Sequence, residues 1–330
     1  MNVLLVTRSD DNESVDLMRH ALKKHGAKGV RFDTDHYPTA VGLSSELTQK
    51  KTKRVLHVPD GSVDLDSLTS IWYRRFLAGG RLPDSLGDMR DACVDESRRT
   101  LYGTIAACRC FQLDTLRAVR RCDHKELQLR KAREFGLEIP RTLFSNFPED
   151  VRRFSASIKG EVITKMQHSF AIYRGADENV VFTNTISQDD LVSLEGLAFS
   201  PMTFQEKLDK RVELRATVVG NRVLTAAVDS QALEGAKLDW RKEGVTLLDA
   251  WTKYQLPRSV ERGLLKLTKW FGLNYAAADF IVTPEGRHVF LEINAGGEFY
   301  WLQRTPGLPI VEALAEVLVG KAKRVDSGEA

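Results

Sequence analysis

Cysteine is scarce in this chain, and apolar runs long enough to cross a membrane are missing. All four cysteines fall between Cys93 and Cys122, and no second group with metal-ligand spacing stands elsewhere. We therefore expect reduced thiols rather than a zinc site or a disulfide framework. The apolar stretch at the N-terminus is too short for a signal peptide, and no stretch approaches the length of a membrane span. These absences predict a cytoplasmic protein without a membrane partner.

A strong excess of one charge is also missing. Lysine and arginine number 48 against 45 aspartates and glutamates, so the chain lacks the basic surplus of a nucleic-acid coat, and we expect no nucleic-acid partner. No G-x-G-x-x-G pattern follows the first predicted strand, which argues against a dinucleotide site there. The sequence has no internal repeat and no low-complexity segment.

The patterns that are present indicate an α/β protein. The chain has 330 residues, 42% of them hydrophobic, which is enough for two or three domains. An apolar strand at residues 2–7 precedes a helical pattern that ends at Gly26, which predicts a small doubly wound domain over residues 1–117. Its further strands are expected at residues 30–32, 54–58 and 70–73, and residues 87–121 are expected to be helical. A central unit at residues 118–202 and a C-terminal unit at residues 203–330 follow.

A polar hairpin near the C-terminus offers oxygen ligands. Two β-rich runs, residues 280–282 and 289–293, are separated by the turn sequence TPEGR. Asp279 lies on the first strand, and Glu292 and Asn294 lie two apart on the second, so these two side chains share a face. Carboxylate and amide oxygens suit magnesium, which usually keeps phosphates and waters as its other ligands. Taken alone, the triplet is more typical of a polar hairpin edge.

Two lysines in different contexts are candidates for binding phosphate groups. Lys125 opens a predicted helix, and Lys165 stands mid-strand among apolar residues. An ammonium group at an inward-facing strand position is costly unless it meets an anion, so a phosphate contact and a structural role are equally favoured for Lys165. For Lys125 alone, a surface position on the helix is the simpler interpretation.

An extended segment after the central unit, residues 205–208, is a predicted binding site for a nucleoside. Its backbone groups can hydrogen-bond an adenine edge. Glu213, further along, can accept hydrogen bonds from both ribose hydroxyls, and Arg215 on the same strand face can hold a phosphoryl group or a substrate carboxylate bidentately. As an isolated pattern, alternating charges on a strand are typical of a solvated sheet face. The residues of the extended segment are Gln205, Glu206, Lys207 and Leu208.

The order of these features along the chain resembles that of the ATP-grasp superfamily. The features are the two lysines, the extended segment, Glu213 with Arg215, and the polar hairpin. The likeness extends over nearly the whole chain to the ATP-grasp ligases that macrocyclise ribosomally made precursor peptides, the microviridin and wider graspetide maturases. It implies a pre-ATP-grasp domain at residues 1–117, followed by central (118–202) and C-terminal (203–330) ATP-grasp subdomains. The sequences that carry it are IWYRR at 71–75, KELQLRKA at 125–132, GLEIPRT at 136–142, ELRATVVG at 213–220, DSQ at 229–231 and DWR at 239–241.

The resemblance implies a reaction, its cofactors and a partner. ATP, with Mg²⁺ on Asp279, Glu292 and Asn294, would phosphorylate a side-chain carboxylate of the peptide, and a hydroxyl or amine of the same peptide would attack the acyl phosphate. Arg215 and Arg241 would hold the acyl phosphate. The partner would be a ribosomal precursor peptide with a leader and a core rich in Thr and Glu or Asp. The family tends to dimerise, which allows a homodimer.

Several alternatives stay open at this point. Residues 170–194 suit either an edge or helix for the leader peptide or a lid over ATP. The chain could instead be an ATP-grasp ligase that adds free amino acids to a peptide or protein, a kinase for a small molecule, or a nucleotide-gated peptide-binding module without turnover. IWYRR and DWR argue against the first of these, and the complete metal-ligand set with both lysines argues against the last. Ester or amide products, and the number of rings, depend on the precursor.

Overall fold

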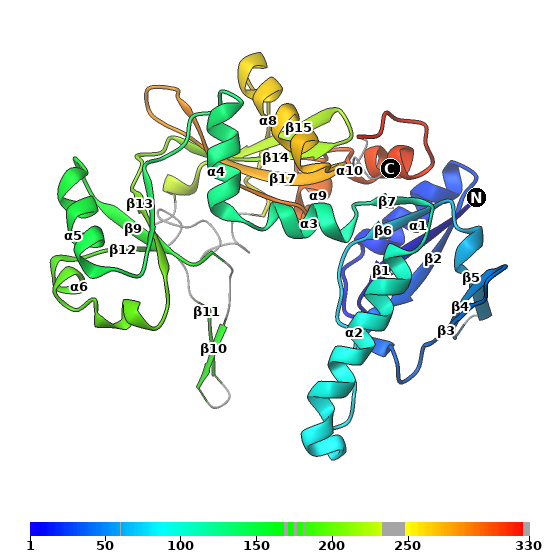
Figure 1. Cartoon of the computed structure of the whole chain (residues 1–330). Coiled ribbons are helices and arrows are strands. Elements are labelled where there is room, and N and C mark those ends of the chain that lie inside the picture. Colours follow the sequence, from blue (N-terminus) through cyan, green and yellow to red (C-terminus); the bar gives the residue numbers. More distant parts are fainter. Residues whose placement is uncertain (60, 168–170, 175–176, 181–182, 233–247, 326–330) are drawn as a thin grey trace.

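The computed structural model describes residues 1–59, 61–167, 171–174, 177–180, 183–232 and 248–325, and Figure 1 shows their arrangement. The N-terminal unit contains a parallel sheet in the order β2-β1-β6-β7. Val3 and Leu5 face one core while Leu4 and Val6 face another, so both sides of this sheet are covered. Its strands are β1 (Asn2–Thr7), β2 (Lys28–Asp33), β6 (Ser70–Tyr73) and β7 (Phe111–Leu113).

The parallel sheet is doubly wound. From β1 the chain passes through α1 (Ser14–Lys24) to β2 on one side, and it later returns to β6 on the other side of β1. The order of the strands therefore reverses between β1 and β6. This arrangement confirms the predicted α/β fold class. The long helix α2 (Arg90–Ala106) extends away from the sheet as an arm (Figure 1).

One predicted strand has different partners from those expected. Residues 54–58 do form a strand, within β4 (Thr52–Val58), but it pairs with β3 (Gly42–Leu47) and β5 (Gly61–Asp64) in a separate antiparallel sheet. The parallel sheet instead takes β7, from a stretch that we expected to be helical, as its fourth strand. The first error arises because a short β-rich run indicates a strand without indicating which strand lies beside it. The second arises because β7 is a three-residue strand between two helices, too short to interrupt a helical pattern.

The central unit is a small antiparallel sheet with its own core. The strand order is β12-β9-β13-β8, and the buried residues include Val162 and Phe204 of the sheet and Val151 of α5. A short hairpin of β10 (Ala171–Arg174) and β11 (Asp177–Val180) projects from this unit (Figure 1). The remaining elements are β8 (Thr142–Ser145), α5 (Pro148–Ser157), β9 (Val162–Lys165), β12 (Asn184–Thr185), α6 (Gln188–Val192) and β13 (Met202–Glu206).

The C-terminal unit is a five-stranded antiparallel sheet in the order β16-β15-β14-β17-β18. Leu214, Ala216 and Val218 of β14 pack with helices α3, α4 and α8 on one face. The other face packs on α10, which also contacts α1 and so joins this sheet to the N-terminal unit. The elements are α3 (Leu116–Cys122), α4 (Lys125–Glu134), β14 (Val212–Val219), β15 (Arg222–Val228), β16 (Thr252–Tyr254), α8 (Arg258–Phe271), β17 (Tyr275–Val282), β18 (His288–Asn294), α9 (Tyr300–Arg304) and α10 (Ile310–Leu318).

Residues 207–211 connect β13 of the central sheet to β14 of the C-terminal sheet without helix or strand. Within the described ranges, no helix combines the length and apolar character that a membrane span requires. Short 3-10 helices complete the fold: η1 (Thr34–His36), η2 (Leu65–Ser67), η3 (Asp84–Met89), η4 (Glu195–Ala198) and η5 (Ser230–Ala232).

Candidate nucleotide and metal site

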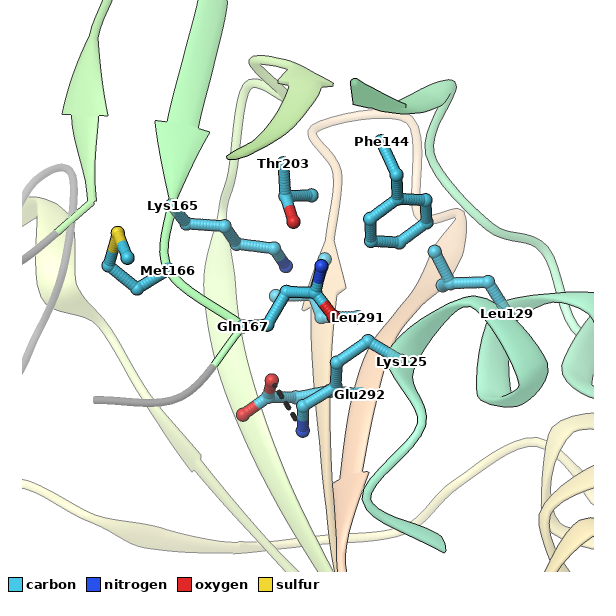
Figure 2. A pocket seen from close by; sticks show the side chains of 9 residues that line it. All are labelled: Lys125, Leu129, Phe144, Lys165, Met166, Gln167, Thr203, Leu291 and Glu292. Carbon is cyan, nitrogen blue, oxygen red and sulfur yellow. Dashed lines mark ion pairs between the residues drawn. The ribbon is translucent and has the colours of Figure 1, made fainter. Parts of the chain in front are cut away.

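A pocket lies between the central sheet, the start of α4 and strand β18 (Figure 2). The Lys165 side chain extends into it from the end of β9, and Glu292 enters it from β18. Lys125, the first residue of α4, reaches it from the helix that packs on β18. The fold therefore brings together two lysines and one acidic residue that lie on three separate elements. The full lining is Lys125, Leu129, Phe144, Lys165, Met166, Gln167, Thr203, Leu291 and Glu292.

Lys125, Glu292 and Asn294 form a closed set of polar contacts. The Lys125 Nζ atom lies 3.1 Å from Glu292 Oε2 and donates to Asn294 Oδ1 at the same distance. The Asn294 amide donates to Glu292 Oε1 at 2.9 Å. The two oxygen-bearing side chains thus project together from β18, as their spacing of two residues predicts, and one ammonium group contacts both.

The charge of Glu292 is stabilised by its surroundings. Burial alone would raise the pKa of this carboxyl group, but the positive charges of Lys125 and Lys165, with hydrogen bonds from Asn294 and Lys125, outweigh burial and hold the pKa well below its ordinary value. Glu292 is consequently a carboxylate at neutral pH. Among the described residues that line the pocket, the charged side chains are Lys125, Lys165 and Glu292, and ammonium groups at this place can contact phosphate oxygens.

Arg215 holds Asp279 on the neighbouring strands of the same sheet. Arg215 on β14 is directly opposite Asp279 on β17, and its Nη1 atom donates to both carboxylate oxygens at 2.8 Å. Asp279 in turn is directly opposite Glu292 on β18. Gly297 permits this packing, because a Cβ atom at that position would lie 2.6 Å from the Ala277 Cβ and 2.8 Å from the Arg215 Nη2. Asp279, Glu292 and Asn294 are thus grouped at one place on paired strands.

This oxygen-rich group fits a magnesium ion in its donor chemistry. Two carboxylates and one amide carbonyl are hard oxygen donors of the kind that Mg²⁺ prefers. The Lys125 ammonium group, in contact with both Glu292 and Asn294, shows that the group already accommodates a positive charge. Asp279, Glu292 and Asn294 are the residues that would hold the ion. Their role as ligands remains a prediction.

The side chains of the extended segment are engaged in structural contacts. Gln205 is buried, and its amide donates to Thr142 Oγ1 at 2.8 Å. Glu206 Oε1 accepts a hydrogen bond of 2.8 Å from the Arg141 backbone. Lys207 Nζ lies 2.6 Å from the Glu161 carboxylate. The backbone N–H groups of Glu206 and Lys207 also donate to carbonyl oxygens, those of Arg141 at 3.1 Å and Glu161 at 2.9 Å. The contact of adenine with the backbone of Glu206, Lys207 and Leu208 remains a prediction.

Of the other two predicted site residues, the structure describes Glu213 but not Arg241. Glu213, the predicted ribose ligand, lies on β14 two residues before Arg215, and its carboxylate accepts from Lys210 Nζ at 2.7 Å. Arg241 lies outside the described residues. Most of residues 170–194, the predicted leader surface or lid, are described, and they include β12 and α6.

Sequence analysis missed six of the residues that line the pocket: Leu129, Phe144, Met166, Gln167, Thr203 and Leu291. Thr203 lies two residues before Gln205 on β13, so the alternation of side chains along a strand was the signal for it. Phe144 of β8 and Leu129 of α4 supply an apolar wall. No sequence signal distinguishes these two from ordinary core residues, because only the approach of α4 to the central sheet gives them a shared surface.

Replacing Lys165 with alanine is expected to weaken binding of Mg·ATP roughly tenfold, or about 1.4 kcal/mol, because a cation facing the anion site is removed. Calorimetric titration with a non-hydrolysable ATP analogue measures the change. Lys159→Ala is the matched control, since Lys159 is exposed a few residues before the same strand. Equal affinity of Lys165→Ala and the parent would exclude Lys165 from the phosphate site.

Comparisons with known proteins agree with this geometry. Residues 2–120 match the family model of the MvdD pre-ATP grasp domain. The structure of a Chryseobacterium gregarium RiPP-associated ATP-grasp ligase, in complex with ADP and a leader and core peptide, has a TM-score of 0.96 and 38% identity over 100% of this chain and 99% of that one. No match was found among curated proteins.

Two macrocyclases of Microcystis aeruginosa are similar as well. MdnC, bound with the precursor peptide MdnA, is 43% identical with a TM-score of 0.89 over 97% of this chain and 100% of that one. MdnB is 31% identical with a TM-score of 0.71 over 97% and 99%. The similarity extends over the full length of these enzymes and confirms the predicted relationship. The chain belongs to the ATP-grasp ligases of the graspetide type, the family of RiPP macrocyclases.

Proposed function

We propose that this chain is an ATP-dependent ligase that activates side-chain carboxylates of a ribosomal precursor peptide as acyl phosphates and joins them to side-chain hydroxyls or amines in macrocyclic esters or amides. The observation that carries the proposal is the pocket in which Lys125 and Lys165 flank Glu292, beside the Arg215–Asp279 pair. Relatives that are 38% and 43% identical were solved with leader and core peptides or with a precursor peptide, which supports a peptide substrate.

The chemistry needs two bond exchanges and no protein nucleophile. A carboxylate oxygen of the peptide attacks the γ-phosphorus of ATP, and ADP leaves. A hydroxyl or amine of the same peptide then attacks the acyl carbon, loses its proton and displaces inorganic phosphate. Because both reacting groups belong to one chain, the second step is intramolecular and its effective concentration is high. Each ring consumes one ATP and removes one water from the peptide.

The chain's residues supply binding and electrostatic stabilisation. Lys125 and Lys165 contact the phosphate oxygens, and the backbone of Glu206 to Leu208 and the carboxylate of Glu213 bind adenine and ribose. Arg215, with Arg241, holds the anionic acyl phosphate while the nucleophile approaches. Mg²⁺ held by Asp279, Glu292 and Asn294 would supply charge neutralisation at the phosphates. The geometry of the pocket supports the roles of Lys125, Lys165 and Glu292, and the order of the residues in the family supports the other roles.

The partner is a precursor peptide with a leader and a core rich in Thr and Glu or Asp. The proposed place of action is the cytoplasm, where ribosomes supply this peptide. A homodimer is consistent with the family. A ligase for free amino acids and a nucleotide-gated binding module are the competing functions, and the products of one reaction distinguish all three.

Mass spectrometry of a precursor peptide tests the proposal. Incubation with the enzyme, ATP and Mg²⁺ should lower the peptide mass in steps of about 18 Da, one water for each ring closed after acyl activation. Omission of ATP is the control and should leave the mass unchanged. A gain of an amino-acid residue would indicate the amino-acid ligase, and a gain of phosphate would indicate a kinase. Nucleotide-dependent peptide binding without any change in mass would indicate the binding module.

A further inference from the structure

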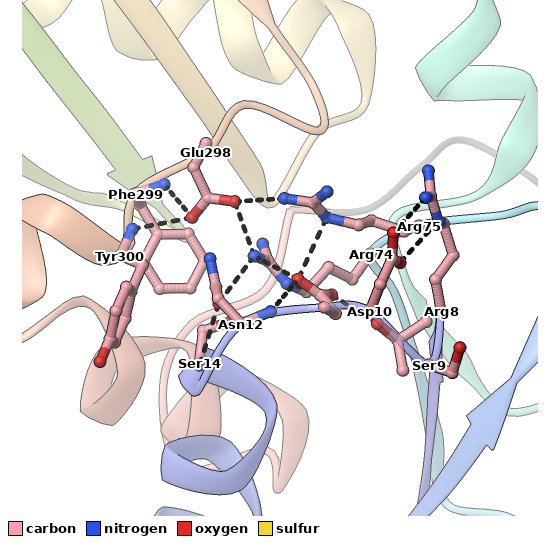
Figure 3. Close-up of polar contacts among 12 residues, drawn as sticks. Arg8, Ser9, Asp10, Asn12, Ser14, Arg74, Arg75, Glu298, Phe299 and Tyr300 are labelled. Atoms are coloured by element: carbon pink, nitrogen blue, oxygen red, sulfur yellow. Dashed lines mark hydrogen bonds and ion pairs between the residues drawn. The ribbon is translucent and has the colours of Figure 1, made fainter. Parts of the chain in front are cut away.

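The N-terminal sheet places charged residues where a doubly wound sheet usually binds a ligand. Such sheets bind ligands outside the carboxyl ends of the strands, at the point where the strand order reverses. In this chain that point lies between β1 and β6. Asp11 follows β1, and Arg74 and Arg75 follow β6, with both arginine backbone N–H groups donating to Val6 of β1. Figure 3 shows that the side chain reaching this edge is Glu298, from the C-terminal unit.

Glu298 is held by both arginines at once. Its Oε2 atom accepts hydrogen bonds of 2.7 Å from Arg74 Nη2 and 2.7 Å from Arg75 Nη2. The same arginines contact Asp11 through their Nε atoms, at 2.8 Å from Arg74 and 3.1 Å from Arg75. Two guanidinium groups therefore face two carboxylates, and the four charges balance only when Glu298 is present. We call these four residues the interdomain clasp.

The clasp is partly shielded from solvent. The side chain of Asp11 is 0% exposed and that of Arg74 is 4% exposed, whereas those of Glu298 and Arg75 are 30% and 37% exposed. The Arg74 guanidinium also lies 5.2 Å from the centre of the Phe299 ring. Buried charges of this kind depend strongly on each partner, because removing one leaves the other uncompensated in a poorly hydrated place.

The backbone of Glu298 connects the clasp to the candidate active site. Its carbonyl oxygen accepts a hydrogen bond of 3.2 Å from Arg215 Nη2, and the other nitrogen of that guanidinium binds Asp279. Its Oε1 atom accepts from the backbone N–H groups of Phe299 and Tyr300, both at 2.9 Å, which fixes the turn after the loop. Glu298 therefore ends the loop of residues 295–297 that begins beside Asn294. One residue thus links the N-terminal unit to the group that holds Asp279.

We propose that Glu298 is a positioning residue for the reaction: through the interdomain clasp, the N-terminal unit fixes the loop of residues 295–297 and the orientation of Arg215 toward Asp279. The inference rests on the proposed function for the reaction that it assists. It gives the N-terminal unit a role in the chemistry itself, in addition to any contact with the peptide. The edge of the sheet that would otherwise be available to a ligand is used to hold a loop of the active site.

The test compares Glu298→Gln with Asp66→Asn. Asp66 is a matched control within the same N-terminal unit. It lies in η2, after the separate antiparallel sheet, its side chain is 34% exposed, and its carboxylate lies 2.6 Å from Arg54 of β4, whose side chain is 8% exposed. With ATP, Mg²⁺ and a precursor peptide, Glu298→Gln should lower kcat for the first loss of water about 100-fold, the effect of a displacement of about 1 Å at a reacting centre. KM for ATP and for the precursor should stay within about twofold. Asp66→Asn should leave kcat within about twofold of the parent.

A second measurement judges the clasp independently of turnover. Hydrogen–deuterium exchange of peptides covering residues 295–300 should be faster in Glu298→Gln and unchanged in Asp66→Asn. Parental kcat in Glu298→Gln would overturn the proposal, and so would a raised KM for the precursor with an unchanged kcat, which would make Glu298 a binding residue. If the parent closes no ring, the proposed function fails, and the exchange data alone decide: equal exchange in Glu298→Gln and the parent overturns the clasp, and faster exchange supports it.

Discussion

Replacing Glu292 with glutamine is expected to leave the fold intact and to lower the rate of ring formation at least about 100-fold. The substitution keeps the size of the side chain and removes its charge. The ammonium groups of Lys125 and Lys165 would then lose the negative charge with which both interact. One oxygen donor of the predicted Mg²⁺ group would also be weakened. Turnover at saturating ATP, measured as loss of water from the precursor, gives the effect.

A glutamate in the same hairpin provides the control for this change. Glu285 is exposed in the turn between β17 and β18, so Glu285→Gln removes the same charge from the same hairpin without touching the pocket. It should have parental turnover. The two variants should be compared at limiting Mg²⁺, where a weakened ligand set has its largest effect. If Glu292→Gln were as active as Glu285→Gln at limiting Mg²⁺, Glu292 would have no place in the site.

Local pattern predicted the parts of the fold that depend on neighbours in sequence. The C-terminal hairpin with its turn at residues 283–287 is confirmed because a strand, a short turn and a second strand determine their own pairing. The same logic placed Asp279 on one strand and Glu292 on the next, and the structure pairs them directly. The shared face of Glu292 and Asn294 follows from the period of a strand alone.

Contacts between distant segments were beyond the sequence. Lys125 and Asn294 are 169 residues apart, and the salt bridge of Lys125 to Glu292 depends on how α4 packs on β18. Arg74 and Glu298 are 224 residues apart, and nothing near either residue indicates its partner. The resemblance to a family pointed to IWYRR as a signature, but only the packing of the N-terminal unit on the C-terminal sheet shows what its arginines contact.

The sequence also did not show which group within the protein the Arg215 side chain contacts. Arg215 was predicted to hold a phosphoryl group or a substrate carboxylate, which remains a prediction, and in the structure its guanidinium contacts the carboxylate of Asp279. Burial alone would lower the pKa of Arg215, but Asp279 outweighs burial and raises it, so the guanidinium keeps its charge. The remaining nitrogen of the fork is bound to the Glu298 carbonyl. Arg215 is therefore oriented before any substrate arrives, which lowers the reorganisation that charge stabilisation would require.

Replacing Arg215 with lysine should therefore distinguish the effect of its positive charge from the effect of the guanidinium geometry. Lysine keeps the positive charge but lacks the planar fork, in which Nη1 contacts both Asp279 oxygens while Nη2 binds the Glu298 carbonyl oxygen. We expect ring formation to fall about 100-fold. We also expect the ratio of ADP released to water lost from the peptide to rise above one, because an acyl phosphate that is poorly held is hydrolysed before the internal nucleophile reaches it. Coupled assay of ADP alongside mass spectrometry of the peptide measures both quantities.

Arg222→Lys is the matched control for this last change, since Arg222 lies on the adjacent strand β15, is exposed, and pairs with Glu316 away from the pocket. It should keep the parental rate and a ratio of one ADP for each water lost. Arg215→Lys with that same rate and ratio would show that charge alone suffices. A slower rate at an unchanged ratio would place Arg215 in the phosphoryl transfer step, before the acyl phosphate exists. Only a slower rate together with an excess of ADP fits a guanidinium that retains the activated carboxylate until the ring closes.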